Sequence, residues 1–442
     1  MFRILKSLPL LAIGLFVCCE RLPGSGDGTP VEGTELAIEW EAPQQVKAGS
    51  SKVIGGYPRI HRLNDSRLML SYSADGNAYA SFSLDEGKKW SSPKKIMKYE
   101  DISNSKGSAR LTAAVPDFTQ LSADHPKHPG RIIYACNYRP RELKSDGTLG
   151  EKGWTTVAPY DISISFSDDN GASWSEPKHV YKSGQWTENL KKGCWEPFVL
   201  ELPDGTVQVY FADETPYYIQ YGASESSKKD WMNISVIESK DGGDTWRPVR
   251  VITQNSECRD GMPVVAIHED KLLLAIETTD YKGQRLHPIV ICNPIENNWA
   301  SVVGKGSTLR FEPFLTSIAS EVNYSGSPYI ITTDNYVVYS YQIADWWKPA
   351  PGMSASEQLR QAKLNNEEQH ATLEVQVCPK SEVENGYFRT MRAPSRPLPV
   401  DQTTGKENAL WNSICDLGDD EIMAVSQYNN RVYTVRGKIV MK

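Results

Sequence analysis

The sequence predicts an all-β protein that folds as a six-bladed β-propeller with four antiparallel strands in each blade. Three observations support this prediction: a repeated acidic turn, a repeated two-strand unit, and a strand-like N-terminal segment without a blade of its own. The chain has 442 residues, of which 39% are hydrophobic and 23% are charged, as in ordinary globular proteins. Repeat folds of this length form one unit, so the number of domains does not follow from length alone.

The repeated acidic turn has the pattern S-x-D-x-G-x-x-W. It occurs at residues 83–90, 167–174 and 239–246, and each copy follows an apolar, strand-like run. Asp accepts hydrogen bonds from nearby backbone N–H groups, and Gly adopts the positive φ that such a turn requires. We call this element the Asp turn and expect it to join the third and fourth strands of a blade. Its aspartates, predicted to be structural, are Asp85, Asp169 and Asp241.

The two-strand unit consists of a short strand, a polar turn and a second strand, and it occurs six times. Five copies begin near a proline, which a strand tolerates at its first residue. The sixth copy begins at Trp411 and lacks the proline. Each copy is predicted to be the A–B hairpin of one blade, so six units of four strands give the propeller. The five prolines are Pro58, Pro116, Pro197, Pro263 and Pro328.

The N-terminal segment Trp40-Glu41-Ala42-Pro43 resembles the segments that follow the Asp turns, such as Trp90-Ser91-Ser92-Pro93. No blade precedes it, so we expect it to supply the outer strand of blade six, beside a third strand near residues 432–440. This pairing would close the ring. Segment 350–372, rich in Gln, Glu and Ala, is the one predicted helical insertion.

The first residues have the pattern of an export signal. Arg3 and Lys6 precede an apolar run, residues 8–17, that is too short to span a membrane as a stable helix. Leu15-Phe16-Val17-Cys18 resembles a bacterial lipobox, which makes Cys18 the expected lipidation site and leaves Cys19 as the alternative.

This assignment divides the chain into a signal peptide (1–17), a flexible tether (18–35) and a single catalytic propeller (36–442). The Gly- and Pro-rich composition of residues 20–33 suits a tether. We expect an exported lipoprotein, periplasmic or anchored at the outer membrane or cell surface, that contacts a membrane only through its lipid. We expect a monomer.

Composition excludes some partners. The net charge is −7 and no basic run occurs, so nucleic acid is not an expected partner. The seven histidines show no metal-ligand spacing, and no metal or other cofactor is predicted. Six cysteines beyond the N-terminus show no C-x-x-C pair, which leaves disulfides and buried thiols both open.

Strand direction places polar residues on one face. The start of strand A and the end of strand B share a face, and the Asp turns lie on the opposite one. Two interpretations are open for the first face: a solvated rim, or a binding site. Glu196 and Glu277 adjoin apolar residues, and partial burial would raise a carboxyl pKa as a general acid requires. The residues predicted on this face include Arg59, Asp117, Arg139, Glu196, Arg259, Asp260, Glu277 and Tyr341.

Glycoside hydrolases typically use a pair of carboxyl groups. Here such a pair comes from neighbouring blades. Glu196 belongs to blade three and Glu277 to blade four. One would protonate the leaving oxygen, while the other would attack the anomeric carbon or activate water. Their separation, which the sequence does not give, decides between retention and inversion.

The Asp turns and several short motifs resemble the sialidase superfamily of six-bladed propellers and, within it, glycoside hydrolase family 93, the exo-acting α-1,5-L-arabinanases. The resemblance implies a retaining enzyme that acts on oligo- or polysaccharide, with Glu196 as acid/base and Glu277 as nucleophile. It also implies that Tyr341 and the arginines orient substrate. The motifs are Tyr57-Pro58-Arg59, Trp195-Glu196-Pro197-Phe198, Arg259-Asp260-Gly261-Met262-Pro263 and Ser327-Pro328-Tyr329.

Two alternatives stay open. An exo-sialidase would use three arginines on a substrate carboxylate, for which Arg59, Arg139 and Arg259 are available. However, the chain reads Pro58-Arg59-Ile60 where a sialidase reads R-I-P, and Asp117 is the candidate for the sialidase acid/base. The other alternative is a non-catalytic, glycan-binding surface lipoprotein.

Overall fold

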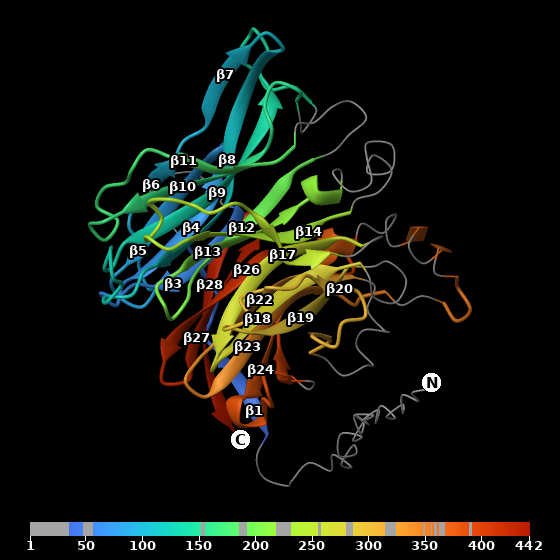
Figure 1. Ribbon diagram of the computed structural model, residues 1–442. Coiled ribbons are helices and arrows are strands. Elements are labelled where there is room, and N and C mark those ends of the chain that lie inside the picture. Colours follow the sequence, from blue (N-terminus) through green and yellow to red (C-terminus); the bar gives the residue numbers. More distant parts are fainter. Residues whose placement is uncertain are drawn as a thin grey trace, which may run out of the picture.

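The computed structural model is a ring of six β-sheets arranged about a central axis (Figure 1). The innermost strand of each sheet contacts the innermost strands of both neighbouring sheets, so the ring is closed. The six-bladed propeller predicted from the sequence is therefore confirmed. The structure describes residues 35–46, 56–151, 155–184, 192–217, 231–254, 258–279, 286–313, 324–347, 350–354, 356–357, 360–361, 367–388 and 391–442.

Each of the first three blades contains the predicted A–B hairpin, followed by a C–D hairpin. Blade one comprises β3 (Gly56–Arg62), β4 (Leu68–Ala74), β5 (Asn77–Ser83) and β6 (Lys94–Met97). Blade two comprises β7 (Glu100–Asn104), β8 (Gly107–Gln120), β9 (Ile132–Glu142), β10 (Asp161–Ser167) and β11 (Lys178–Lys182). Blade three comprises β12 (Cys194–Glu201), β13 (Val207–Asp213), β14 (Asn233–Ser239) and β15 (Arg250–Val251).

Blades four to six repeat the plan without an Asp turn. Blade four comprises β17 (Asp260–His268), β18 (Lys271–Thr278), β19 (His287–Pro294) and β21 (Arg310–Phe311); β16 (Thr253–Gln254) and β20 (Val303–Gly304) form a small parallel pair. Blade five comprises β22 (Tyr324–Thr332), β23 (Tyr336–Ala344), β24 (Thr372–Pro379) and β25 (Arg392–Ser395). Blade six comprises β26 (Ala409–Gly418), β27 (Glu421–Tyr428), β28 (Arg431–Met441) and β1 (Leu36–Trp40), with β2 (Gln44–Gln45) also paired to β28.

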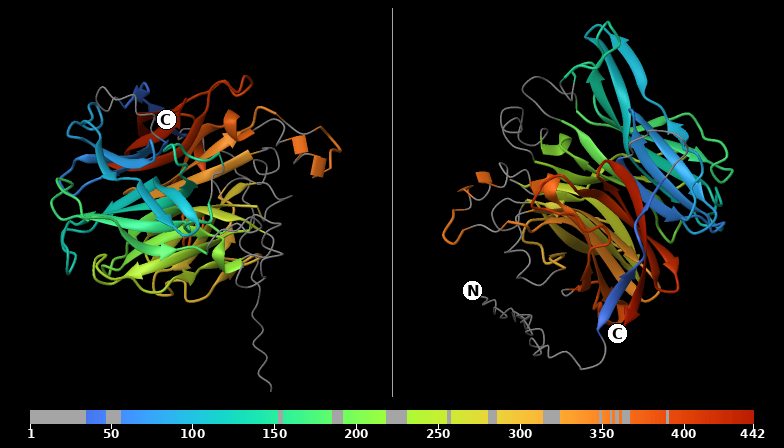
Figure 2. Two further views of the ribbon diagram at one scale, coloured as in Figure 1. Left: turned by 90° about the horizontal axis from the view of Figure 1, so that it is seen from above. Right: turned by 180° about the vertical axis from the view of Figure 1, so that it is seen from behind.

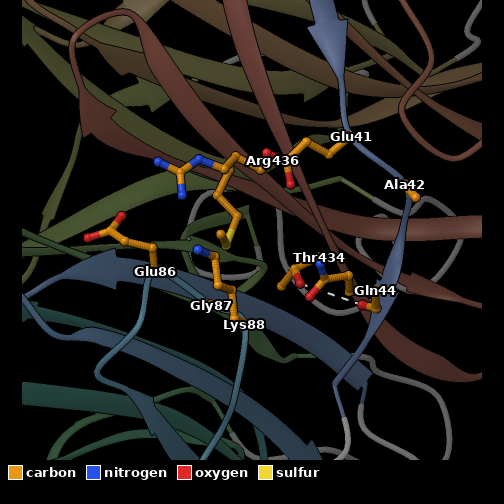
Figure 3. A pocket seen from close by; sticks show the side chains of 9 residues that line it. Glu41, Ala42, Gln44, Glu86, Gly87, Lys88, Thr434 and Arg436 are labelled. Carbon is orange, nitrogen blue, oxygen red and sulfur yellow. Dashed lines mark hydrogen bonds between the residues drawn. The ribbon is translucent and has the colours of Figure 1, made fainter.

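The N-terminal strand closes the ring as predicted. β1 runs antiparallel to β28, from Leu36 opposite Met441 to Trp40 opposite Gly437, and the two ends of the propeller lie side by side (Figure 2). Gly437 leaves room for the Trp40 ring, because a Cβ at this position would lie 2.4 Å from Trp40 Cε3. A small hollow at this seam, lined by Glu41, Glu86 and Arg436 among others, lies on the Asp-turn face (Figure 3).

The Asp turns have the predicted geometry. In the second copy, Asp169 Oδ1 accepts the Ser173 N–H at 2.7 Å, and Gly171 has φ +84°. Ser167 completes the turn: its hydroxyl donates to Asp169 Oδ1 at 2.8 Å and accepts the Gly171 N–H at 2.8 Å. The turns around Asp85 and Asp241 repeat these bonds. All three aspartates therefore stabilise turns, on the face away from the glutamates.

A feature that the sequence did not reveal repeats in every blade. Each A strand carries a β-bulge, near its start in five blades and midway along β8 in blade two. The bulge holds a non-glycine residue at positive φ, between 45° and 55°. Five of these residues precede a proline, which ordinarily favours an extended conformation. Such backbone strain persists only where the surroundings enforce it, and bulges redirect side chains. The six residues are Tyr57, Val115, Glu196, Met262, Ser327 and Trp411.

Blade two departs from the predicted plan. β8 and β9 have 14 and 11 residues, and β7 pairs with the first half of β8 as a fifth strand. These strands project beyond the other blades (Figure 1). The start of β8 and the end of β9 lie on the face predicted to carry the site, so the projection forms a wall on that face.

Three further points concern the cysteines, the helical insertion and the N-terminus. The six cysteines of the propeller are buried and form no disulfide within the described chain. The predicted helical insertion is described only in part, where η1 (Glu367–His370) is a short 3₁₀ helix; a second, η2 (Lys380–Glu382), follows β24. The signal peptide, Cys18 and nearly all of the tether lie outside the described residues. Within the described segments, no helix is long and apolar enough to cross a membrane.

Candidate active site

Glu196 and Glu277 reach the same face from neighbouring blades, as the sequence predicts. Glu196 is the bulge residue of β12, with φ 48°, and so its side chain is set by strained backbone. Glu277 lies near the end of β18, opposite Gly261 of β17. The two carboxyl groups interact electrostatically, since the charge of Glu277 acts on Glu196.

Glu277 has a hydrogen-bond donor on each of its carboxyl oxygens. Its side chain is 3% exposed, and its Oε1 accepts a hydrogen bond from Arg259 Nη1 at 2.5 Å. Its Oε2 accepts the Ser327 N–H at 2.9 Å. A guanidinium and a backbone amide both favour the charged form of a carboxyl group. These contacts hold the carboxyl group in one position and orientation, as a nucleophile requires.

Two glycines leave space for the Glu277 carboxylate. A Cβ on Gly326 would lie 2.7 Å from Glu277 Oε2, and one on Gly261 would lie 3.4 Å from Oε1. Neither glycine has a positive φ. The requirement for glycine is therefore steric at Gly326, whereas 3.4 Å at Gly261 is an ordinary contact distance. We call Arg259, Gly261, Gly326 and Ser327 the Glu277 cradle.

Glu196 has the opposite environment. Burial raises the pKa of Glu196, with Glu277 adding to the rise, whereas the charges of Arg139 and Arg259 lower it. The nearest cation is Arg139, whose Nη2 lies 3.9 Å from Glu196 Oε1. Glu196 Oε2 is buried and has no hydrogen-bond partner within the described structure. A carboxyl group with a raised pKa and an unsatisfied oxygen suits a general acid.

Two of the predicted arginines join the glutamates. Arg259 remains charged because the carboxylates of Glu277 and Glu196 outweigh the effect of burial on its pKa. Arg139 donates from Nε to Asn137 Oδ1 at 2.7 Å, and its guanidinium lies over the Trp195 ring, 5.1 Å from the centroid. The predicted candidates Glu196, Glu277, Arg139 and Arg259 therefore form one cluster.

Arg59 and Asp117 have internal partners. Arg59 is 3% exposed, and its Nη1 donates to the carbonyls of Pro58 and Asn412 at 3.0 and 2.9 Å. It also stacks over the Tyr57 ring at 3.9 Å. Asp117 is fully buried and accepts the Val199 N–H at 2.8 Å. Arg59 thereby connects blade one to blade six, and Asp117 connects blade two to blade three.

The side chains of Asp260 and Tyr341 likewise bond to other residues of their own blades. Both oxygens of Asp260 accept from Arg310, at 2.9 and 3.1 Å, which makes an ion pair within blade four in which Asp260 is fully buried. Tyr341 is 1% exposed; it donates to Glu374 and accepts from Gln376 Nε2 at 2.7 Å. Their described contacts are with the scaffold.

The sequence analysis missed Tyr324, which lies beside the Glu277 cradle. A Cβ on Gly326 would lie 3.3 Å from Tyr324 Oη and 2.7 Å from Glu277 Oε2, so both oxygens border the same space. Tyr324, like Trp346 and Trp411, packs against a small buried cluster of Ala344, Ala371 and Leu410. The sequence does contain a signal for Tyr324. It lies four residues before Pro328, just as Arg259 lies four residues before Pro263.

Within the described residues, no group of three or more His, Cys, Asp or Glu side chains could hold a metal ion. The cations that face the two glutamates are arginines. The described site therefore consists of acids, arginines and aromatic side chains.

Fold and site together define a sialidase-like six-bladed propeller whose polar face holds two carboxyl groups in contrasting environments. Solved structures with this fold include an α-L-arabinanase from Penicillium chrysogenum bound to arabinobiose (16% identity, TM-score 0.56, covering 90% of this chain and 98% of that one). Another is the family GH93 α-L-arabinofuranosidase of Fusarium graminearum with arabinobiose (14%, TM-score 0.54, covering 91% and 98%).

A sialidase also matches: NanB from Streptococcus pneumoniae, at 13% identity and TM-score 0.51, covers 91% of this chain and 70% of that one. No protein-family model matches the sequence, and the search of curated proteins finds no relative. At these identities the likeness concerns the fold, which confirms the sialidase-like propeller expected from the motifs.

Proposed function

We propose that the protein is an exo-acting glycoside hydrolase that uses a retaining, two-glutamate mechanism. The observation that carries this proposal is the contrast between two carboxyl groups on adjacent blades. One oxygen of Glu277 accepts a hydrogen bond from the Arg259 guanidinium, and the other accepts one from the Ser327 amide. In contrast, burial raises the pKa of Glu196. A carboxyl group anchored by donors on both oxygens suits the nucleophile, and a buried carboxyl group with a raised pKa suits the acid.

In the proposed reaction, Glu277 attacks the anomeric carbon while Glu196 gives its proton to the leaving glycosidic oxygen. The sugar is then bonded to Glu277, and Glu196, now ionised, takes a proton from the water that releases it. Arg259 would hold Glu277 in place through both steps. The group that transfers the proton and the group that forms the bond thus stay distinct.

The proposed substrate is a plant or host polysaccharide such as α-1,5-L-arabinan. Its support is the resemblance of the motifs around Glu196 and Arg259 to the exo-arabinanases, together with the shared fold of two proteins solved with arabinobiose. Fold alone does not assign a sugar, so the substrate must be tested directly.

A second candidate is an exo-sialidase. Arg139 and Arg259, whose charges act on Glu196, and Tyr324 near Glu277 are features that such an enzyme would use. Against it, the third available arginine, Arg59, is buried and donates to two backbone carbonyls. A glycan-binding protein without activity is the third outcome of the same test.

The test is incubation with linear arabinan and with sialyllactose, followed by chromatography of the products. Arabinobiose or arabinose supports the proposal, free sialic acid supports the sialidase, and binding without products supports the non-catalytic alternative. Glu196→Gln and Glu277→Gln should each lower kcat by about 10²-fold or more. Full activity of both variants would refute the catalytic assignment.

For the N-terminus we propose export and lipidation at Cys18, with the mature protein a monomer in the periplasm or at the cell surface. The support is the charged start, the short apolar run and the Leu15-to-Cys18 motif. Labelling with a fatty-acid analogue in a bacterial host tests this: Cys18→Ser should abolish labelling, whereas Cys19→Ser should not.

A further inference from the structure

Bulge residues from opposite sides of the ring meet on its axis. Tyr57, Val115 and Met262 pack in one buried cluster, and Trp411 packs against it. These residues belong to blades one, two, four and six. Blades one and four lie on opposite sides of the ring, so their side chains can share a cluster only across the central channel. The bulges therefore direct these side chains onto the axis.

The other two bulge residues, Ser327 and Glu196, join this cluster through polar interactions. The Ser327 hydroxyl donates to Met262 Sδ at 3.0 Å, while the Ser327 N–H donates to Glu277 Oε2. The charge of Glu196 acts on Tyr57. We call the six bulge residues the bulge layer. It includes one glutamate of the site and is bonded to the other.

A second layer closes the channel below the bulge layer. It consists of residues two positions after a bulge, from blades one, three and five: Arg59, Phe198 and Tyr329. The Arg59 guanidinium lies 3.9 Å from the centroid of the Tyr57 ring and 5.2 Å from that of Tyr329. The rings of Phe198 and Tyr329 meet edge to face, with centroids 6.3 Å apart. Because these three blades alternate around the ring, their contacts also cross the channel, and the site has a closed bottom.

We propose that the bulge layer is the floor of the sugar-binding pocket, where Tyr57 and Met262 support the sugar between the two glutamates and exclude water from Glu196. The inference rests on the proposed glycosidase function. Pockets for small ligands are lined mainly by apolar side chains, with a few polar groups that fix the orientation of the ligand. The strained backbone of the six bulges serves this floor, since it is held wherever a side chain must reach the axis.

Exclusion of water accounts for the environment of Glu196. Burial has the largest effect on the pKa of Glu196 and raises it, ahead of the charges of Arg139, Arg259, Glu277 and Arg59. The bulge layer supplies apolar surface to this burial. Loss of part of the layer should therefore lower the pKa of Glu196 toward the ordinary value of a glutamate.

Met262→Ala tests the floor. It leaves a space beside the Ser327 hydroxyl, which is polar enough to hold water. Water there favours the ionised form of Glu196, so the alkaline limb of kcat/KM should move to lower pH by roughly half a unit or more. Loss of the contact with the sugar should also lower kcat/KM roughly tenfold below the limb.

Two further variants separate the floor from general packing. Met262→Leu conserves the volume of the side chain and should restore the position of the alkaline limb. Met423→Ala is the matched control, because Met423 is likewise a buried methionine but lines the hollow on the Asp-turn face. This control should lower the melting temperature and leave the alkaline limb in place.

A second measurement needs no substrate. Glu196→Gln removes a carboxyl group whose ionisation favours unfolding, and so it should raise the urea midpoint at pH 8. In the Met262→Ala background the gain should be smaller, because water already stabilises the charge of Glu196. In the Met423→Ala background the gain should equal that in the wild-type protein.

A shifted limb and a smaller gain in Met262→Ala, both absent in Met423→Ala, support the inference. An unmoved limb in Met262→Ala, or equal gains from Glu196→Gln in the two backgrounds, overturns it while the proposed function stands. A wild-type protein that cleaves no glycan overturns the proposed function and the support of a sugar by the floor, and the urea midpoints then decide whether the layer excludes water from Glu196.

Discussion

Arg259 Nη1 lies 2.5 Å from Glu277 Oε1, although the two side chains begin on opposite strands of one hairpin. The contact is buried on the carboxylate side, and the second oxygen of Glu277 is satisfied by the Ser327 amide of the next blade. Residues of two blades therefore hold this carboxylate in place. Glu196, from a third blade, is held by strained backbone and has one unsatisfied oxygen.

The pH dependence of activity should report Glu196. As the general acid it must be protonated, so kcat/KM falls as the pH rises through the pKa of Glu196. Because the charge of Arg139 lowers this pKa, Arg139→Met should raise it and move the alkaline limb of the pH profile to higher pH. The control is Arg62→Met, since Arg62 pairs with Glu86 on the Asp-turn face. An alkaline limb that does not move in Arg139→Met would contradict the assignment.

Glu196 should also reduce stability at neutral pH. Its pKa in the folded protein is raised above its ordinary value of 4.5, so ionisation favours the unfolded chain. The destabilisation is absent below that ordinary value and complete above the folded pKa. Glu196→Gln should thus stabilise the protein at pH 8 by roughly 1 kcal/mol, with no gain near pH 4. Urea unfolding at both pH values measures this, and equal stabilities at pH 8 would refute it.

Gly326 should be essential to the cradle. A methyl group there would lie 2.7 Å from Glu277 Oε2, so Gly326→Ala must displace the carboxylate or the strand. We expect at least a tenfold loss of kcat, on the order of one lost catalytic contact. Gly56→Ala is the matched control at the corresponding position of blade one, where the new methyl would meet only the flexible end of Gln427. Equal activities of the two variants would argue against the cradle.

The Asp turns should affect stability and leave catalysis unchanged. Asp169→Ala removes the acceptor for the Ser167 hydroxyl and for the Ser173 amide and hydroxyl. The melting temperature should fall by several degrees, while kcat/KM at temperatures well below unfolding stays at the wild-type value. A selective loss of kcat in the folded variant would place this turn in the catalytic machinery.

The sequence alone predicted the architecture because the motifs that indicate it are local. The Asp turns fix the strand phase through bonds between residues two to four apart, and the phase assigns Glu196 and Glu277 to one face. The N-terminal strand could be placed because Trp40 to Pro43 repeats the residues that follow each Asp turn.

The site was less predictable because it depends on contacts between blades. Nothing near Asp260 in the sequence indicates that Arg310, 50 residues away, occupies both of its oxygens. Tyr324 was missed for the same reason. The positive φ of Glu196 was also hidden, because the proline after it favours extended backbone. Comparison of the blades from their prolines would have aligned Tyr324 with Arg259.

The most direct test of the two-glutamate mechanism is to trap the sugar on the protein. Glu196→Ala, given an aryl glycoside of the sugar that the wild-type protein releases, should form the covalent intermediate quickly and hydrolyse it slowly. Acid quenching, proteolysis and mass spectrometry should then find one glycosyl unit on the peptide that contains Glu277. A glycosyl unit on Tyr324, or turnover of the aryl glycoside with no adduct at Glu277, would contradict the mechanism.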